Sequence, residues 1–247
     1  MDASLDIVRR RALQARRATP LMTGHEARGD GTFSGVSQRP YPEPQAARLL
    51  SVAEWAALPE DEAGELIDGR LVEEEMPDCV HELAVAWLIH TLRAWLIPRG
   101  GFVFGSEVKY ALRPRRGRKS DVSAFLPTSR RPPARGAVGV PPDIMVEIVS
   151  PSPRDSRRDR VEKLEEYAAF GVRWYWLLDP QLRTLEIHEL ARGGLYHHRL
   201  TAPGGVLPEV PGCEGLTLDL DALFRELDRL DATEPQEPPQ GSADDES

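Results

Sequence analysis

Long apolar runs and cysteines are both scarce in this chain of 247 residues, and each shortage excludes a class of protein. No apolar run approaches the roughly 20 residues that a membrane-spanning helix needs. The N-terminus lacks the apolar segment of a secretory signal peptide. The two cysteines, Cys79 and Cys213, fit neither a metal-binding spacing nor a disulfide framework. We therefore expect a protein of the reducing cytoplasm that does not associate with membranes.

Positive charge is also in deficit, because the formal net charge is −9, and this argues against a nucleic-acid partner. The distribution of charge weakens that objection. Residues 231–247 hold six acids and no base, whereas residues 1–48 hold eight bases and five acids. Between them, bases crowd two short segments: Arg113, Arg115, Arg116, Arg118 and Lys119, then Arg154, Arg157, Arg158, Arg160 and Lys163. A polyanion needs a local basic surface more than a basic total, so nucleic acid remains a candidate partner.

The two ends of the chain differ from its middle. Residues 1–48 are rich in Arg, Gly, Pro and Ser and show little apolar periodicity, which predicts a disordered leader. Residues 231–247 predict an acidic, disordered tail. Hydrophobic residues make up 40% of the chain, so residues 49–230 can bury the core of one domain.

Local signals in this middle part predict an α/β domain. Ser51 and Glu54 form a capping box for a short helix, Asp68-Gly69 supplies a hairpin turn within 65–72, and Asp78 caps a helix that runs to about Ile97. The other expected elements are strands at 102–112, 121–126, 143–150 and 174–179, a helix at 156–170, a hairpin of 184–190 with 195–201, and a segment at 216–227 that begins extended and ends helical. The central order of helix, three strands, helix and strand predicts a mixed sheet in an α/β layer arrangement with additional hairpins.

Two carboxylates in the expected strands are candidate metal ligands. Glu147 lies in the apolar run Ile144–Val149, where a buried carboxylate needs a cation or a metal as its partner. An outward-facing Glu on an edge strand explains the same residue equally well. Asp121 opens the preceding strand and could bring a second carboxylate to one Mg²⁺ ion, although an Asp at a strand start is common.

Other polar residues are less informative by themselves. Lys163 falls at the edge of a helix face, where a solvated lysine whose stem covers apolar surface is the simpler interpretation. The histidines His90, His188, His197 and His198 are interpreted as surface or hydrogen-bonded core residues. The adjacent pair His197-His198 is not interpreted as a zinc site, because neighbouring strand residues point to opposite faces. Trp174 and Trp176 share a strand face and are interpreted as core.

Several segments together resemble the Uma-two family of restriction endonucleases, a bacterial branch of the PD-(D/E)XK nuclease superfamily. The segments are Glu65–Val72 with His81 at a helix start, Ser120–Val122, Pro142–Ser152, and Lys163–Tyr167 running on to Gly171–Pro180. The resemblance covers about residues 51–201 and rests on the order and spacing of these segments. It implies a restriction-endonuclease-like core, whose order of helix, three strands, helix and strand is also the order expected from the local signals.

The resemblance also implies roles for individual residues. Asp121 matches the first metal-binding acid, Glu147 the second, and Glu65 a further acid beside the metal. The lysine usually found two residues after the second acid is replaced by Val149, and Lys163 on the following helix matches it instead. His81 matches an auxiliary histidine. Ser120 stands where the family has a proline, which weakens the motif without removing a chemical group.

The function implied is a nuclease that depends on Mg²⁺ or Mn²⁺ and hydrolyses phosphodiester bonds in nucleic acid, with DNA the favoured substrate. Arg113, Arg115, Arg116, Arg118, Lys119, Arg157 and Arg158 are the candidate phosphate-binding residues. A homodimer stays open, since cutting a duplex needs two sites. One alternative is a catalytically inactive module of the same fold that binds DNA or a protein. Another is an unrelated hydrolase, such as a glycosidase with paired carboxylates.

Overall fold

The computed structural model describes residues 48–59, 64–73, 76–152 and 156–231. The predicted leader, nearly all of the predicted tail, and Arg154 lie outside these residues. Within the ranges just given, no helix is both long and apolar enough to cross a membrane.

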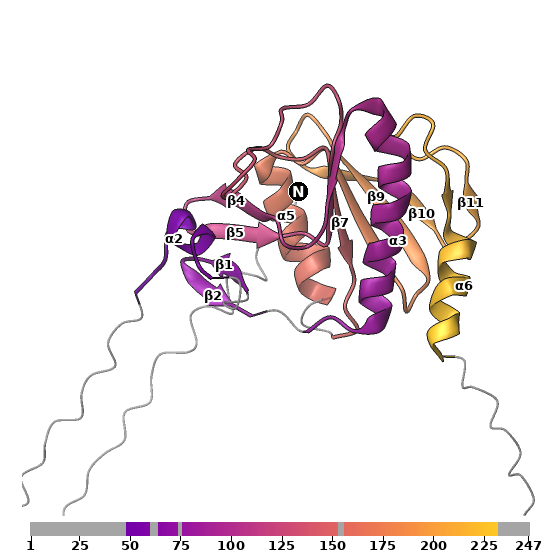
Figure 1. Cartoon of the computed structure of the whole chain (residues 1–247), viewed down its shortest axis with the longest axis horizontal. Coiled ribbons are helices and arrows are strands. Elements are labelled where there is room, and N and C mark those ends of the chain that lie inside the picture. The colour runs from indigo at the N-terminus through magenta and orange to yellow at the C-terminus, as the bar shows by residue number, and fades with distance from the viewer. Residues whose placement is uncertain (1–47, 60–63, 74–75, 153–155, 232–247) are drawn as a thin grey trace, which may run out of the picture. The chain divides into compact units, whose positions relative to one another are not determined.

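A mixed sheet of six strands forms the centre of the domain, with the strand order β10-β9-β8-β7-β6-β3 (Figure 1). Its strands are β3 (Phe102–Phe104), β6 (Val122–Phe125), β7 (Ile144–Ile148), β8 (Trp174–Asp179), β9 (Thr184–Leu190) and β10 (Tyr196–Ala202). The central pair, β7 and β8, is parallel, and the other neighbours are antiparallel. The predicted mixed sheet is therefore confirmed.

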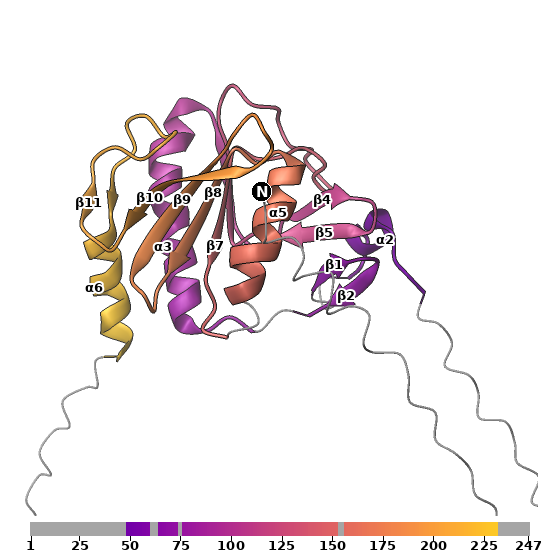
Figure 2. The ribbon, with the colours of Figure 1, turned by 180° about the vertical axis from the view of Figure 1, so that it is seen from behind.

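Helices cover both faces of this sheet, as the two opposite views show (Figures 1 and 2). One face is covered by α3 (Cys79–Leu96) and α6 (Leu220–Asp231), which contact each other. The short 3₁₀ helix η1 (Ile97–Arg99) ends α3 at Gly100, whose φ of 85° suits glycine. The other face is covered by α5 (Leu164–Phe170), which continues the π-helical segment η2 (Arg158–Lys163).

A smaller sheet of four strands lies beside α5 in both views (Figures 1 and 2). Its order is β2 (Arg70–Val72), β1 (Glu65–Ile67), β5 (Arg116–Lys119) and β4 (Lys109–Arg113). The short helix α2 (Val52–Ala56) covers it through Trp55, which packs so closely on Gly117 that a Cβ there would lie 2.2 Å from the indole ring. A two-stranded pair, β11 (Val206–Leu207) and β12 (Leu218–Asp219), precedes α6.

Most of the local predictions are confirmed. Ser51 and Glu54 make both halves of the capping box, and Asp78 accepts a hydrogen bond from the His81 amide at the start of α3. Asp68 and Gly69 form the hairpin turn with positive φ values of 50° and 83°. All five residues of β7 are buried, as the apolar run predicts.

One prediction about the strands is wrong, and the structure adds two features that were not predicted. The single strand expected at 102–112 is split at residues 105–108 into β3 and β4, which belong to different sheets. The basic segment 113–119 contains an unexpected strand, β5, which pairs with both β4 and β1. The helix expected from residue 156 is widened into the π-helix η2 before it becomes α5.

Candidate active site

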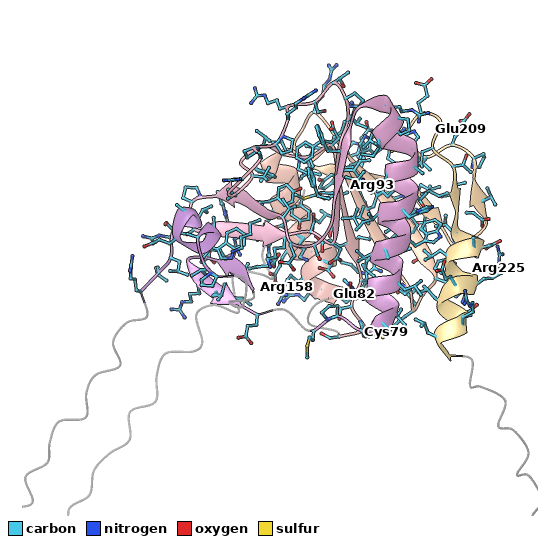
Figure 3. The ribbon with its side chains drawn as sticks, in the orientation of Figure 1. Cys79, Glu82, Arg93, Arg158, Glu209 and Arg225 are labelled. Atoms are coloured by element: carbon cyan, nitrogen blue, oxygen red, sulfur yellow. The ribbon has the colours of Figure 1, made fainter. Side chains whose placement is uncertain are left out.

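A pocket of about 610 Å³ opens where α3 begins, β7 ends and η2 passes over the sheet. Residues at the start of β6, in the turn after β8 and near the end of α6 also line the pocket. Figure 3 labels two of the lining residues, Glu82 on α3 and Arg158 on η2, toward the end of the domain where α3 begins. Asp121, Glu147, Lys163 and His81 all line this pocket, so the structure brings together four residues predicted from the sequence.

Asp121 is fixed between the end of β7 and the start of α3. Its Oδ2 atom accepts a 2.7 Å hydrogen bond from the backbone amide of Ile148, and its Oδ1 atom lies 3.3 Å from Nε2 of His81. His81 is itself placed by the Asp78 cap of α3. Burial alone would lower the pKa of His81, but the hydrogen bond and charge of Asp121 outweigh burial and raise it. The hydrogen bond from the Ile148 amide thus orients the carboxylate of Asp121 through Oδ2, while Oδ1 faces His81.

Glu147 is buried on the face of β7 that α5 covers, and a separate donor approaches each of its oxygens. Lys163 lies 2.7 Å from Oε2, and the Tyr167 hydroxyl donates a 2.6 Å hydrogen bond to Oε1. Burial raises the pKa of Glu147 well above its usual value, and Lys163 offsets only part of that rise. The interpretation of Glu147 as a buried, paired carboxylate therefore holds, whereas the outward-facing alternative does not.

Lys163 is likewise a buried residue, with 4% exposure, and not the solvated lysine considered from its helix position. Burial alone would lower its pKa, but Glu147, Asp159 and Glu65 together raise the pKa well above the usual value. The side chain therefore stays an ammonium ion at neutral pH. A permanent cation held against carboxylates can neutralise a developing negative charge.

Asp159 is a site residue that the sequence analysis missed. It is 5% exposed, its Oδ1 atom lies 3.1 Å from Nζ of Lys163, and it lines the pocket. Its backbone carbonyl accepts a 2.9 Å hydrogen bond from the Tyr175 hydroxyl. Asp159 and Lys163 are four residues apart within η2, and π-helical turns recur at functional sites. The only signal in the sequence was this spacing, which is equally typical of a surface ion pair.

Glu65 is placed differently from the metal ligand that the resemblance implies. Its two oxygens accept hydrogen bonds from Arg118 Nη1 at 2.5 Å and from the Lys119 amide at 3.0 Å. Burial would raise the pKa of Glu65, but Lys163 and Arg118 outweigh it and hold the pKa below its usual value. Glu65 is absent from the lining of the pocket. In this arrangement it anchors β1 to β5 and contributes negative charge near Lys163.

The candidate phosphate-binding residues fall into three groups. Arg118 is fully buried and Arg116 nearly so, and both form ion pairs with Glu166. Their side chains hold the small sheet against α5 and neither lines the pocket, which corrects the role expected for them. Lys119 and Arg158 line the pocket. Arg113, Arg115 and Arg157 are exposed.

The other histidines and tryptophans among the described residues lie away from the pocket lining. His90, His197 and His198 are exposed, and His188 is half-buried beside Tyr175 and Tyr196. Trp174 and Trp176 lie in the apolar core, as predicted. Both cysteines are unpaired, with Cys79 exposed and Cys213 buried.

The pocket contains carboxylate oxygens that could bind a divalent metal ion. Among the residues that the structure describes, no three His, Cys, Asp or Glu side chains are arranged around a common point. However, each carboxylate oxygen has two lone pairs, and the oxygens of Asp121 and Glu147 each receive a single contact from the neighbours named above. Both acids line the pocket, and oxygen donors are what Mg²⁺ prefers. The residues therefore fit such an ion in donor chemistry and in charge.

Comparison with known proteins identifies the family. A model of the Uma2 family, described as "Putative restriction endonuclease", matches residues 52–221. Four chains of solved structures match, among them "a putative nuclease belonging to DUF820" from Anabaena variabilis, at 21% identity and a TM-score of 0.55. That match covers 72% of this chain and 99% of the other, and it shows a shared fold. Comparison with curated proteins finds no match. Because the family match spans most of the sequence, the chain belongs to the Uma2 family.

Proposed function

We propose that this chain is a metal-dependent nuclease that hydrolyses phosphodiester bonds in nucleic acid, with DNA as the favoured substrate. The observation that carries the proposal is the convergence of Asp121, Glu147 and Lys163, from three separate elements, on one pocket. An acid pair beside a buried ammonium ion is the set of groups that metal-assisted phosphodiester hydrolysis requires. Membership of a restriction-endonuclease family supports the same reaction class.

In this mechanism Asp121 and Glu147 would hold Mg²⁺ or Mn²⁺. The bound ion would polarise the phosphodiester and lower the pKa of a water molecule. The Ile148 amide and the Tyr167 hydroxyl orient the two carboxylates, because each donates a hydrogen bond to one of them. Lys163 supplies positive charge where the pentacovalent phosphate develops negative charge.

The rim of the pocket would hold the backbone of the substrate. Lys119 and Arg158 line the pocket from β5 and η2 and are the nearest of the expected phosphate contacts. Further basic groups would come from three exposed residues outside the pocket lining, Arg113, Arg115 and Arg157. The affinity of this surface for nucleic acid should fall steeply with added salt, since each phosphate contact releases counterions.

One observation favours the second candidate function, a catalytically inactive module that binds DNA or a protein partner. Both oxygens of Glu147 are occupied by hydrogen bonds from Lys163 and Tyr167, which is the arrangement expected of a purely structural pair. A module of this kind would keep the fold and the basic rim without binding a metal. Metal binding therefore distinguishes the two functions.

The first experiment is titration calorimetry of the full chain with Mn²⁺. We expect wild type to bind Mn²⁺ and Glu147→Ala to lose most of that binding. The matched control is Glu165→Gln, which removes an exposed glutamate on α5 outside the pocket and should bind as wild type does. If folded wild type fails to bind Mn²⁺ both alone and with a DNA duplex present, the inactive module becomes the better account.

Cleavage assays then test the reaction and its substrate. Supercoiled plasmid, linear duplex and single-stranded RNA should be incubated with wild type, with Asp121→Ala and with Glu165→Gln. We expect metal-dependent nicking of DNA by wild type and by the control, and none by Asp121→Ala. Cleavage that persists in chelator would contradict the metal-dependent mechanism and support a different hydrolase.

Two further proposals concern the setting of the reaction. We infer a homodimer, because two sites are needed to cut both strands of a duplex, and sedimentation with and without DNA tests it. We also place the protein in the cytoplasm, consistent with its unpaired cysteines.

A further inference from the structure

Lys163 is shared between two buried carboxylates that come from different elements. Glu147 on β7 lies 2.7 Å from its Nζ atom, and Asp159 on η2 lies 3.1 Å from the same atom. The ammonium group carries three donors, so it can satisfy both acids at once. The two acids differ in position, because Glu147 lies within β7, a central strand of the large sheet, while Asp159 and Lys163 belong to one helical segment.

A metal ion on Glu147 would change this balance. The ion and the ammonium group are both cations that seek the same carboxylate, and like charges at close range repel each other. If Glu147 were the only acid holding it, Lys163 would be released towards solvent whenever the metal bound. Asp159 supplies a second acid four residues away on the same segment, and that acid would remain available when Glu147 is taken.

Asp159 is also firmly placed. Its side chain is 7% exposed, and its backbone carbonyl accepts a hydrogen bond from the fully buried Tyr175, which is fixed in β8. Asp159 and Lys163 both belong to η2 and contact each other, and Lys163 also contacts Glu147, so the two residues lie on the side of the segment that faces Glu147. A carboxylate that is buried, tethered and adjacent can hold a lysine side chain in one position.

We propose that Asp159 is a positioning residue that retains the Lys163 ammonium group beside the site when a divalent cation takes the place of that group on Glu147. This inference rests on the metal-dependent function proposed above. Asp159 acts through Lys163 and needs no contact with substrate. Without it, a metal-loaded protein would lose the positive charge that the reaction uses.

The sequence offers a direct way to observe Lys163. The chain contains only three lysines, Lys109, Lys119 and Lys163, so selective ¹⁵N labelling of the lysine side chains gives three possible ammonium signals. Variants Lys109→Arg and Lys119→Arg assign them. A buried ammonium group held by carboxylates exchanges its protons slowly and should give the most persistent signal. Titration with Mg²⁺, which is diamagnetic, then reports whether Lys163 stays in place.

We expect the Lys163 signal of wild type to shift on Mg²⁺ binding but to persist. In Asp159→Asn, which keeps the size of the side chain and removes its charge, the signal should persist without Mg²⁺ and disappear with it. The control Glu165→Gln should behave as wild type. Loss of the Lys163 signal in wild type saturated with Mg²⁺ would overturn the proposal whether or not any variant folds.

Cleavage kinetics provide the second measurement. Asp159→Asn should lower kcat by roughly ten- to a hundredfold, as loss of a supporting partner commonly does, while KM and Mn²⁺ affinity stay near their wild-type values. Asp159→Glu, which restores the charge, should recover much of the loss. If Asp159→Asn matches wild type in both kcat and the Lys163 signal, the role of Asp159 is refuted and the nuclease function stands. If wild type shows no response to Mg²⁺ either alone or with a DNA duplex present, the metal-dependent function fails and this inference fails with it.

Discussion

Val146 and Glu147 are neighbours in β7 and both are buried, but they face opposite sides of the six-stranded sheet. Val146 faces α3 and α6 and belongs to a core formed entirely of apolar side chains. Glu147 faces α5, where the buried groups include tyrosine hydroxyls, Asp159 and Lys163. Alternation along a single strand thus assigns neighbouring residues to two chemically different interiors.

The difference shows how the domain separates stability from chemistry. The face towards α3 buries large apolar side chains such as Trp176 and Leu178, and burial of this kind is the main source of folding free energy. The face towards α5 also has an apolar cluster, which includes Met145 and Leu177, but it buries charges beside that cluster, and the desolvation of these charges consumes much of what their attraction returns. Apolar packing on the face towards α3 can therefore stabilise a domain whose charged site lies on the face towards α5.

Placing a charge on the apolar face should have the largest effect. Val146→Asp would bury a carboxylate without a cation and should lower the free energy of unfolding by more than about 4 kcal/mol, or prevent folding. Val146→Ala, which leaves a cavity without adding charge, should cost roughly 2 kcal/mol. Urea denaturation compares the two. Equal midpoints would mean that this face tolerates charge and that the contrast between the faces is mistaken.

Removing the cation from the polar face should rank second. Lys163→Met leaves Glu147 and Asp159 without their shared ammonium partner and should destabilise the fold by about 3 kcal/mol at neutral pH. The control is Lys119→Met, whose ammonium pairs with the exposed Glu107 and should contribute less than about 1 kcal/mol. Thermal melts of both variants would test this ranking. A similar loss of stability in the two variants would show that the burial of Lys163 does not increase its contribution to the free energy of unfolding.

The sequence was sufficient to predict the apolar face and much of the frame around the site. The caps Ser51 and Asp78 located the starts of α2 and α3, and the apolar run in β7 identified a buried strand. These signals are local, because periodicity and caps act over a few residues. The strand break at residues 105–108 was missed because the apolar residues on its two sides keep the same alternating spacing, interrupted only at Ser106. They are Phe102, Phe104, Val108, Tyr110 and Leu112, and all five belong to or pack against one buried cluster.

The polar face was predicted less completely, because its contacts join residues far apart in the chain. Arg118 was expected on a basic surface, but its partners Glu65 and Glu166 lie 53 and 48 residues away. The only signal of Asp159 was its spacing to Lys163, which a surface ion pair would also show, and a widened helical turn leaves no local pattern in the sequence. Asp121, Glu147 and Lys163 were identified through the order and spacing of family segments, and the structure adds the pocket that they share.

Neutralising the acid on the polar face should have a small effect on stability. Burial raises the pKa of Glu147 well above its usual value, so the folded chain holds a proton on this carboxyl group more readily than the unfolded chain does. Glu147→Gln mimics that protonated form and should change the free energy of unfolding by less than about 1 kcal/mol, in either direction, while abolishing cleavage. As the pH falls through the folded pKa towards the usual value of 4.5, wild type should gain stability relative to the variant. Denaturation at neutral and mildly acidic pH would measure this difference, and a large loss in the variant at neutral pH would contradict it.

The smallest expected effect concerns His188, which lies on the polar face beside Tyr175 and Tyr196. Burial lowers the pKa of His188 below its usual value of 6.5, although Glu186 opposes this. As the pH falls below 6.5, the unfolded chain therefore binds a proton that the folded chain resists, and stability decreases until the folded pKa is reached. His188→Gln should lose less stability than wild type between about pH 7 and pH 5, the interval in which histidines titrate. His197→Gln, at an exposed position in β10, controls for the loss of an imidazole. Parallel loss of stability in His188→Gln and wild type over this interval would show that burial on the polar face does not disfavour the charged form of His188. The effect of burial on pKa would then be limited to the groups around Glu147.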